Sequence, residues 1–100
     1  MKKTKPILAD LLRKMSKKGY YQTLNFICQK DSAHYAEILD YNLKTPIVES
    51  RATVTLIVRN LTALGLIKRT IVDARPIRTV YHPTEKGRKL LDHLHAMEQL

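Results

Sequence analysis

The sequence predicts a mainly helical fold of the α+β class, in which four helices are followed by a β-hairpin and a fifth helix. Five segments place their apolar residues at the spacing of one helix face. Two β-prone runs, residues 67–72 and 77–82, flank a corner at residues 73–76, which is the pattern of a hairpin. With 100 residues, of which 44% are hydrophobic, the chain suffices for one domain, residues 1–100, built around one core.

The first half of the chain is expected to form three helices, at about residues 6–15, 20–30 and 33–41. The second helix should bury Tyr20, Leu24, Ile27 and Cys28. Asp31 and Ser32 break the pattern and can cap the third helix, which should bury Tyr35, Ala36 and Leu39. Residues 42–49 give no clear pattern, because Pro46 disfavours a helical Thr45 and could start a helix after it.

The strongest helix signal begins at Ser50, a good N-cap, and ends before Gly65, where a left-handed C-cap is expected. The apolar face of this helix consists of Val54, Ile57, Val58, Leu61 and Leu64. The opposite face contains no acidic residue and carries Arg51, Thr53, Thr55, Leu56, Arg59 and Asn60. Such a face suits contact with a polyanion.

The second half ends in a hairpin and a helix. Residues 67–72 and 77–82 are the expected strands, and Asp73 to Pro76 form the turn. Pro83 and Thr84 then open a helix that continues to about residue 98. One face of this helix carries Leu90, Leu91, Leu94 and Met97.

The order of these elements predicts a helix-turn-helix at about residues 33–65, followed by a wing at about residues 67–82. The second helix of such a motif enters the major groove of DNA. Arginines on a neighbouring hairpin pair with phosphates or enter a narrow minor groove. The residues expected to contact DNA are Ser50, Arg51, Thr53, Thr55, Arg59, Arg69, Arg75 and Arg78. The alternative for each is a solvated surface position.

The charge distribution agrees with a nucleic-acid partner. The net charge is +9, and it is concentrated in residues 1–18, with a net of +6, and residues 51–82, with a net of +5. Residues 19–50 have a net charge of −2, and residues 83–100 are neutral. Two separated basic blocks favour contact with a polyanion at two places. Charge that serves only solubility is the alternative.

Several other classes of function lack support. No apolar run approaches the roughly 20 residues that span a bilayer, and Asp10 interrupts the apolar N-terminal stretch, which argues against a signal peptide. The single cysteine excludes an internal disulfide. The four histidines lack metal-ligand spacing, and no phosphate loop or catalytic pair is apparent. We expect a cytoplasmic, nucleoid-associated protein that is not an enzyme and uses no cofactor or metal.

Two stretches resemble winged-helix transcription regulators of the MarR and HxlR families. Residues 50–69, SRATVTLIVRNLTALGLIKR, are similar to the MarR recognition helix and the Leu-Gly-Leu-Ile that follows it. Residues 80–91, VYHPTEKGRKLL, are similar to the tyrosine and Thr-x-x-Gly-Arg-x-Leu that follow the wing in both families. The resemblance implies a homodimeric, DNA-binding repressor or activator.

Dimerisation would use the helices at the two ends of the chain. The resemblance implies this arrangement, and the apolar faces of these short helices favour it independently, since little else in a small domain remains to cover them. The candidate interface residues are Ile7, Leu8, Leu11, Leu12, Met15, Leu90, Leu91, Leu94 and Met97. The alternative is that both helices fold onto the core of the same chain. A dimer would read a pseudo-palindromic operator.

The leading hypothesis is therefore a sequence-specific regulator that binds double-stranded DNA. A non-specific architectural or chromatin protein is one alternative, and a winged helix that binds other proteins is another. The polar, basic face of the helix at residues 50–64 argues against the last of these. Cys28 is either a redox-sensitive thiol or, as its apolar helix face favours, a structural one.

Overall fold

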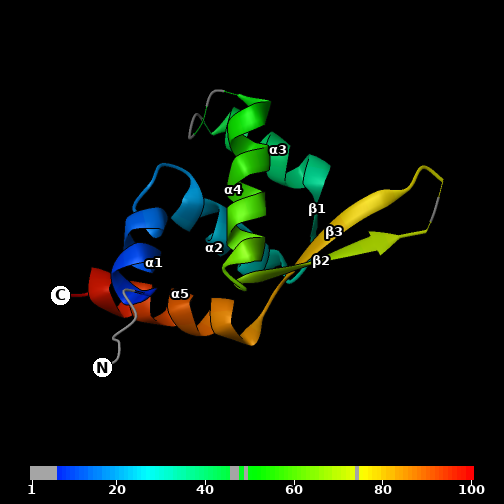
Figure 1. Ribbon diagram of the computed structural model, residues 1–100. Helices are drawn as coiled ribbons and strands as arrows, with labels where there is room; N and C mark the ends of the chain where they lie inside the picture. Colours follow the sequence, from blue (N-terminus) through cyan, green and yellow to red (C-terminus); the bar gives the residue numbers. More distant parts are fainter. Residues whose placement is uncertain (1–6, 46–47, 49, 74) are drawn as a thin grey trace.

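The computed structural model describes residues 7–45, 48, 50–73 and 75–100, and it contains five helices and three strands within them (Figure 1). The elements are α1 (Ile7–Met15), α2 (Tyr20–Lys30), β1 (Ala33–His34), α3 (Tyr35–Lys44), α4 (Arg51–Ala63), β2 (Ile67–Val72), β3 (Arg78–Pro83) and α5 (Glu85–Glu98). The expected helix start after Thr45 involves Pro46, which lies outside the described residues.

Helix α4 has the caps and the buried face that its sequence predicts. The Ser50 side chain accepts a hydrogen bond from the backbone N–H of Thr53 at 3.2 Å. Gly65 follows the helix with φ of +78°, a conformation that glycine adopts without strain. The residues buried on this helix are Val54, Ile57, Val58 and Leu61. Leu64 is partly buried against the same core.

Helix α3 begins and ends later than predicted. Ala33 and His34 form β1, and His34 is the N-cap of the helix in place of Ser32. The Glu37 carboxylate accepts a hydrogen bond from the His34 backbone N–H at 2.8 Å, which completes the start of the helix. Its buried residues are Ile38 and Asn42, whereas Tyr35 and Leu39 are partly buried. Ala36, which was expected to point inward, is exposed.

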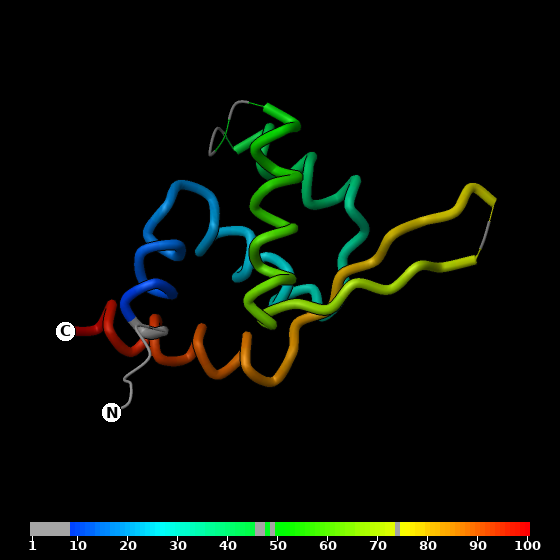
Figure 2. The backbone as a smooth tube through the Cα atoms, in the orientation of Figure 1, coloured from blue at the N-terminus to red at the C-terminus, as the bar shows by residue number. Residues whose placement is uncertain are grey.

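The hairpin belongs to a three-stranded antiparallel sheet with the order β1-β3-β2, so the expected two-stranded hairpin gains a third strand. Ala33 pairs with Tyr81, and the hairpin aligns Ile67 with Pro83 and Val72 with Arg78. The wing, defined as residues 67–83, projects away from the helices as a long ribbon (Figure 2). Strand β3 starts one residue later than predicted, at Arg78, where the pairing with Val72 of β2 begins. Ile77 precedes the strand and is 69% exposed.

The core is formed around α2, and Leu24 and Ile27 of this helix are completely buried. Within the core, the Asn42 side chain donates to the Thr23 hydroxyl at 3.2 Å and to the Ile38 carbonyl at 3.0 Å. These bonds satisfy two polar side chains that would otherwise be costly to bury. Helices α1 and α5 lie beside α2 at the end of the molecule opposite the wing tip (Figure 1).

The start of α5 is fixed to the end of α4 and the root of the wing. The Thr84 hydroxyl donates to the Gly65 carbonyl at 2.6 Å and accepts from the Gly87 N–H at 3.0 Å. The Lys86 ammonium donates to the Leu64 carbonyl at 2.9 Å. Gly87 lies so close to the Leu66 carbonyl oxygen that any Cβ there would overlap it. We call this arrangement the α4–α5 joint. It explains why a threonine and a glycine stand three positions apart at residues 84 and 87.

Candidate nucleic-acid interface

The exposed face of α4 presents most of the side chains expected to contact DNA. Arg51, Thr53, Thr55 and Arg59 are all exposed, and α4 contains no acidic residue. Ser50 is exposed but its hydroxyl is already used as the N-cap. Thr53 lies beside it, with the two hydroxyl oxygens 2.9 Å apart. The Thr55 hydroxyl lies 2.7 Å from the hydroxyl of Tyr35. Among the described residues, Arg51 and Arg59 therefore have the least constrained polar groups on this face.

A groove of about 860 Å³ separates the start of α3 and α4 from the wing. Its floor and walls include Tyr35 from α3, Arg51 and Thr55 from α4, and Arg78 and Tyr81 from β3. The fold thus places Arg51, Thr55 and Arg78 around one hollow, although 27 positions separate the first and last of them in sequence. A site lined by two guanidinium groups favours an anionic ligand.

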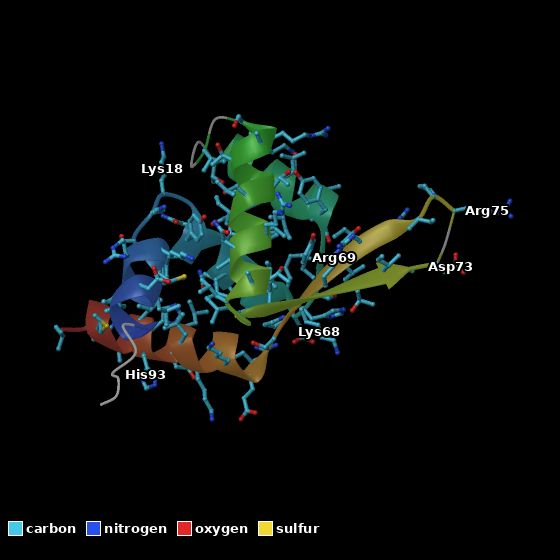
Figure 3. The ribbon with its side chains drawn as sticks, viewed as in Figure 1. Lys18, Lys68, Arg69, Asp73, Arg75 and His93 are labelled. Carbon is cyan, nitrogen blue, oxygen red and sulfur yellow. The ribbon has the colours of Figure 1, made fainter. Side chains whose placement is uncertain are left out.

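A second groove, of about 420 Å³, extends along the other part of α4 and is lined by Thr55, Arg59, Arg69 and Tyr81, among others. Arg69 pairs with Tyr81 across the sheet. Burial raises the pKa of the Tyr81 phenol, and the neighbouring charge of Arg69 opposes that shift. Figure 3 shows Arg69 between α4 and the wing, whereas Lys68 lies below the hairpin.

Tyr35 is a residue of this interface that the sequence pattern assigned to the core. Its hydroxyl lies 2.7 Å from the Thr55 hydroxyl and links the start of α3 to the exposed face of α4. Tyr35 also lines both grooves. Tyr35 is the first residue of α3. The sequence pattern did not indicate this position, because it predicted that the helix starts at residue 33.

One acidic residue, Glu37, also lines the larger groove, but its carboxylate has several partners. It accepts from the backbone N–H of His34 at 2.8 Å, lies 3.1 Å from the Nδ1 atom of His34 and forms an ion pair with Lys30 at 3.2 Å. These interactions, led by the backbone hydrogen bond, lower the pKa of Glu37 to about 2. The ion pair with Lys30 offsets the negative charge that would repel a phosphate.

The tip of the wing reaches the larger groove through Pro76 and Ile77, whereas Arg75 lines neither groove. Arg75 and Asp73 are both exposed, and they lie on the two sides of the tip (Figure 3). Ala74, between them, lies outside the described residues. The structure therefore brings Arg78 and Arg69 close to α4, whereas Arg75 stands at the far end of the hairpin.

The expected dimerisation residues divide into two groups. Met15 and Leu91 are buried in the core of the single chain, so we leave them out of any proposed interface. Leu11, Leu90 and Leu94 are partly buried, while Leu12 and Met97 are 37% and 54% exposed. An apolar groove of about 340 Å³ between the two helices is lined by Leu12, Met15, Ser16, Tyr21, Leu94, Met97 and Glu98. The side chains of Ile7 and Leu8 lie outside the described residues.

The described part of the chain offers no metal site and no membrane-spanning helix. In residues 7–45, 48, 50–73 and 75–100, no group of three or more histidine, cysteine or acidic side chains could hold a metal ion. No helix among these residues is both long and apolar enough to cross a membrane. Cys28 is partly buried, and burial raises the pKa of its thiol, which disfavours the reactive thiolate.

The comparisons with known proteins agree with this fold. Residues 32–100, more than half of the chain, match the model of the family described as HxlR-like helix-turn-helix. No curated protein matches the sequence.

Solved structures resemble the whole fold at low sequence identity. The reduced form of the transcriptional regulator YodB from B. subtilis is 16% identical, with a TM-score of 0.78 over 97% of this chain and 90% of that one. A MarR-family regulator from Enterococcus faecalis V583 is 19% identical, with a TM-score of 0.76 over 99% and 86%. A PadR-like transcription factor from Bacteroides fragilis is 20% identical, with a TM-score of 0.73 over 92% and 88%. These likenesses establish the winged-helix fold.

Proposed function

The chain belongs to the HxlR-like helix-turn-helix family, and from this premise we propose that it is a sequence-specific regulator that binds double-stranded DNA as a homodimer. That it is a DNA-binding regulator and not an enzyme follows from the family itself. The sequence specificity, the homodimer, the pseudo-palindromic operator and a cytoplasmic place of action at the nucleoid belong to the proposal.

The observation that supports the proposal most directly is the position of α4 beside the wing. The face of α4 that carries Arg51, Thr55 and Arg59 borders two grooves whose opposite walls include Arg78 and Arg69. In this arrangement, α4 lies in the major groove, and its first turns meet the base edges. The wing arginines then contact the backbone or the adjacent minor groove.

Arg51 and Arg59 are the residues proposed to read bases, because an arginine in the major groove makes two parallel hydrogen bonds to guanine. Thr55 is suited to a shorter contact, since it is held by Tyr35. Arg69, Arg75 and Arg78 are proposed as phosphate or minor-groove contacts. Thr53 and Ser50 stay in the proposed site as residues that fix the first turn of α4.

The dimer is proposed to form through α1 and α5. The exposed side chains Leu12 and Met97, together with the partly buried Leu94, border the apolar groove between these helices. A second copy would cover this surface and place two copies of α4 on half-sites about one helical turn apart. Ile7, Leu8, Leu11 and Leu90 remain candidate members of that interface.

The proposal is tested by selection of binding sites from a random duplex library with the purified protein at near-physiological salt. Enrichment of a palindrome is the expected result. Retention of DNA without any enriched sequence would replace the proposal with an architectural role. A protein that retains no DNA would point to a winged helix that binds other proteins.

A further inference from the structure

The exposed face of α4 contains an apolar strip that the core does not use. Helical rotation of about 100° per residue places Ala52, Leu56 and Arg59 opposite the buried side chains of this helix. Both Ala52 and Leu56 are exposed, and the exposed fraction of Leu56 is 52%. Because they are four residues apart, they lie next to each other on consecutive turns.

A single exposed leucine on a protein surface needs no explanation. Leu56 differs because it occupies the middle of the face that the proposed function places in the major groove. Arg59, three residues further along, is its neighbour on the helix surface, and α4 has no carboxylate to repel a polyanion. An apolar protein partner would find this leucine beside positively charged side chains, whereas the phosphates of DNA complement them.

The major groove offers one apolar group to such a strip, the 5-methyl group of thymine. Alanine and leucine have no hydrogen-bonding group, so they cannot select guanine, cytosine or adenine through donors or acceptors. They remove apolar surface from water only where a methyl group meets them. The strip covers roughly 6 Å along the helix axis, which is about two base steps.

We propose that Ala52 and Leu56 determine specificity by reading thymine through its 5-methyl group. This inference rests on the proposed function, since it requires α4 to lie in the major groove of a specific site. It assigns the hydrogen-bonded part of the readout to the arginines and the apolar part to this strip. The preferred half-site therefore contains a thymine opposite Leu56.

The test replaces each thymine of the selected site, one at a time, by deoxyuridine, which removes the methyl group and leaves the base pairing intact. Affinity of the wild-type protein, measured by fluorescence anisotropy, should fall about fourfold at the thymine beneath Leu56, the value of one buried methyl group. Leu56→Ala should bind the thymine and deoxyuridine duplexes with nearly equal affinity. Leu43→Ala removes a leucine that is 45% exposed on α3 and should retain the wild-type difference.

Each outcome has a separate meaning. If a selected sequence binds tightly and no deoxyuridine weakens it, the apolar readout is wrong and the proposed function stands. If the loss at deoxyuridine persists unchanged in Leu56→Ala, another residue contacts the methyl group and Leu56 does not. If selection enriches no sequence, both the specific function and this inference fail. Equal melting temperatures of the variants exclude a folding defect.

Discussion

Arg51 and Arg59 are the side chains to which we expect base recognition to be most sensitive. Replacement of Arg51 by alanine should cost about 1–3 kcal/mol of binding free energy on the selected site and relax its sequence preference at one position. Lys89→Ala is the matched removal of one charge, on α5, where Lys89 pairs with Glu85 at 3.4 Å. Equal losses of affinity in the two variants, measured by anisotropy, would mean that Arg51 acts only through its charge.

Glu37 leads to a prediction about stability and pH. Its pKa is lowered in the folded protein from 4.5 to about 2, so its stabilising contribution is complete above pH 4.5 and is lost as the pH falls toward 2. Glu37→Gln should therefore be less stable than the wild type at neutral pH. In urea unfolding, the difference between the two proteins should shrink from pH 5 to pH 2. A difference that stays constant over this range would show that the lowered pKa does not contribute.

The glycine in the α4–α5 joint should tolerate no side chain. A Cβ on Gly87 would overlap the Leu66 carbonyl, and relief requires that α5 move away from the root of the wing. We expect Gly87→Ala to lower the free energy of unfolding by roughly 3 kcal/mol, the upper range for overpacking.

Gly65→Ala provides a comparison for that variant. Its Cβ would have only ordinary contacts, the nearest at 3.8 Å from the Lys86 Nζ atom. Its φ of +78° alone should cost about 1–2 kcal/mol. Denaturant unfolding of both variants shows which one loses more free energy of unfolding. A larger loss for Gly65→Ala than for Gly87→Ala would contradict the steric argument.

At the scale of elements, the wing should contribute affinity without much specificity. The double variant Arg75→Ala and Arg78→Ala should bind all duplexes more weakly. It should also reduce the slope of log affinity against log salt concentration by about 0.9 for each phosphate that the variant no longer neutralises. Titrations at several salt concentrations measure this slope. An unchanged slope, equal to that of Lys89→Ala, would remove the wing from the DNA interface.

The strongly amphipathic helices could be predicted from the sequence, whereas the pairing of β1 with β3 could not. Helix α4 was correct because Ser50, Gly65 and its apolar stripe are all local signals. The start of α3 was wrong because Ala33 pairs with Tyr81, 48 positions away, and no local pattern reveals such a pairing. Tyr35 was missed for the same reason. The grooves could not be predicted, since they depend on how the wing lies against α4.

At the scale of the whole molecule, the proposed dimer makes the end of α5 sensitive to charge. Met97→Lys would place an ammonium group in the interface between two copies, so the dissociation constant of the dimer should rise at least tenfold. Sedimentation equilibrium distinguishes the dimer from the 11.6 kDa chain. Leu43→Lys, on α3, should leave the assembly unchanged. A wild-type protein that sediments as a monomer on DNA and off it would contradict the dimer.

The α4–α5 joint has a mechanical consequence for such a dimer. Thr84, Lys86 and Gly87 fasten the first turn of α5 to the residues between α4 and β2. We therefore expect α4, α5 and the wing to move as one rigid unit. A rotation of α5 caused by the neighbouring subunit would then move α4 and the wing together. Such a motion would leave the contacts of each subunit with its own half-site intact and would alter the distance between the two copies of α4. The spacing of the two half-sites that the dimer prefers would then depend on how α5 is oriented in the dimer interface.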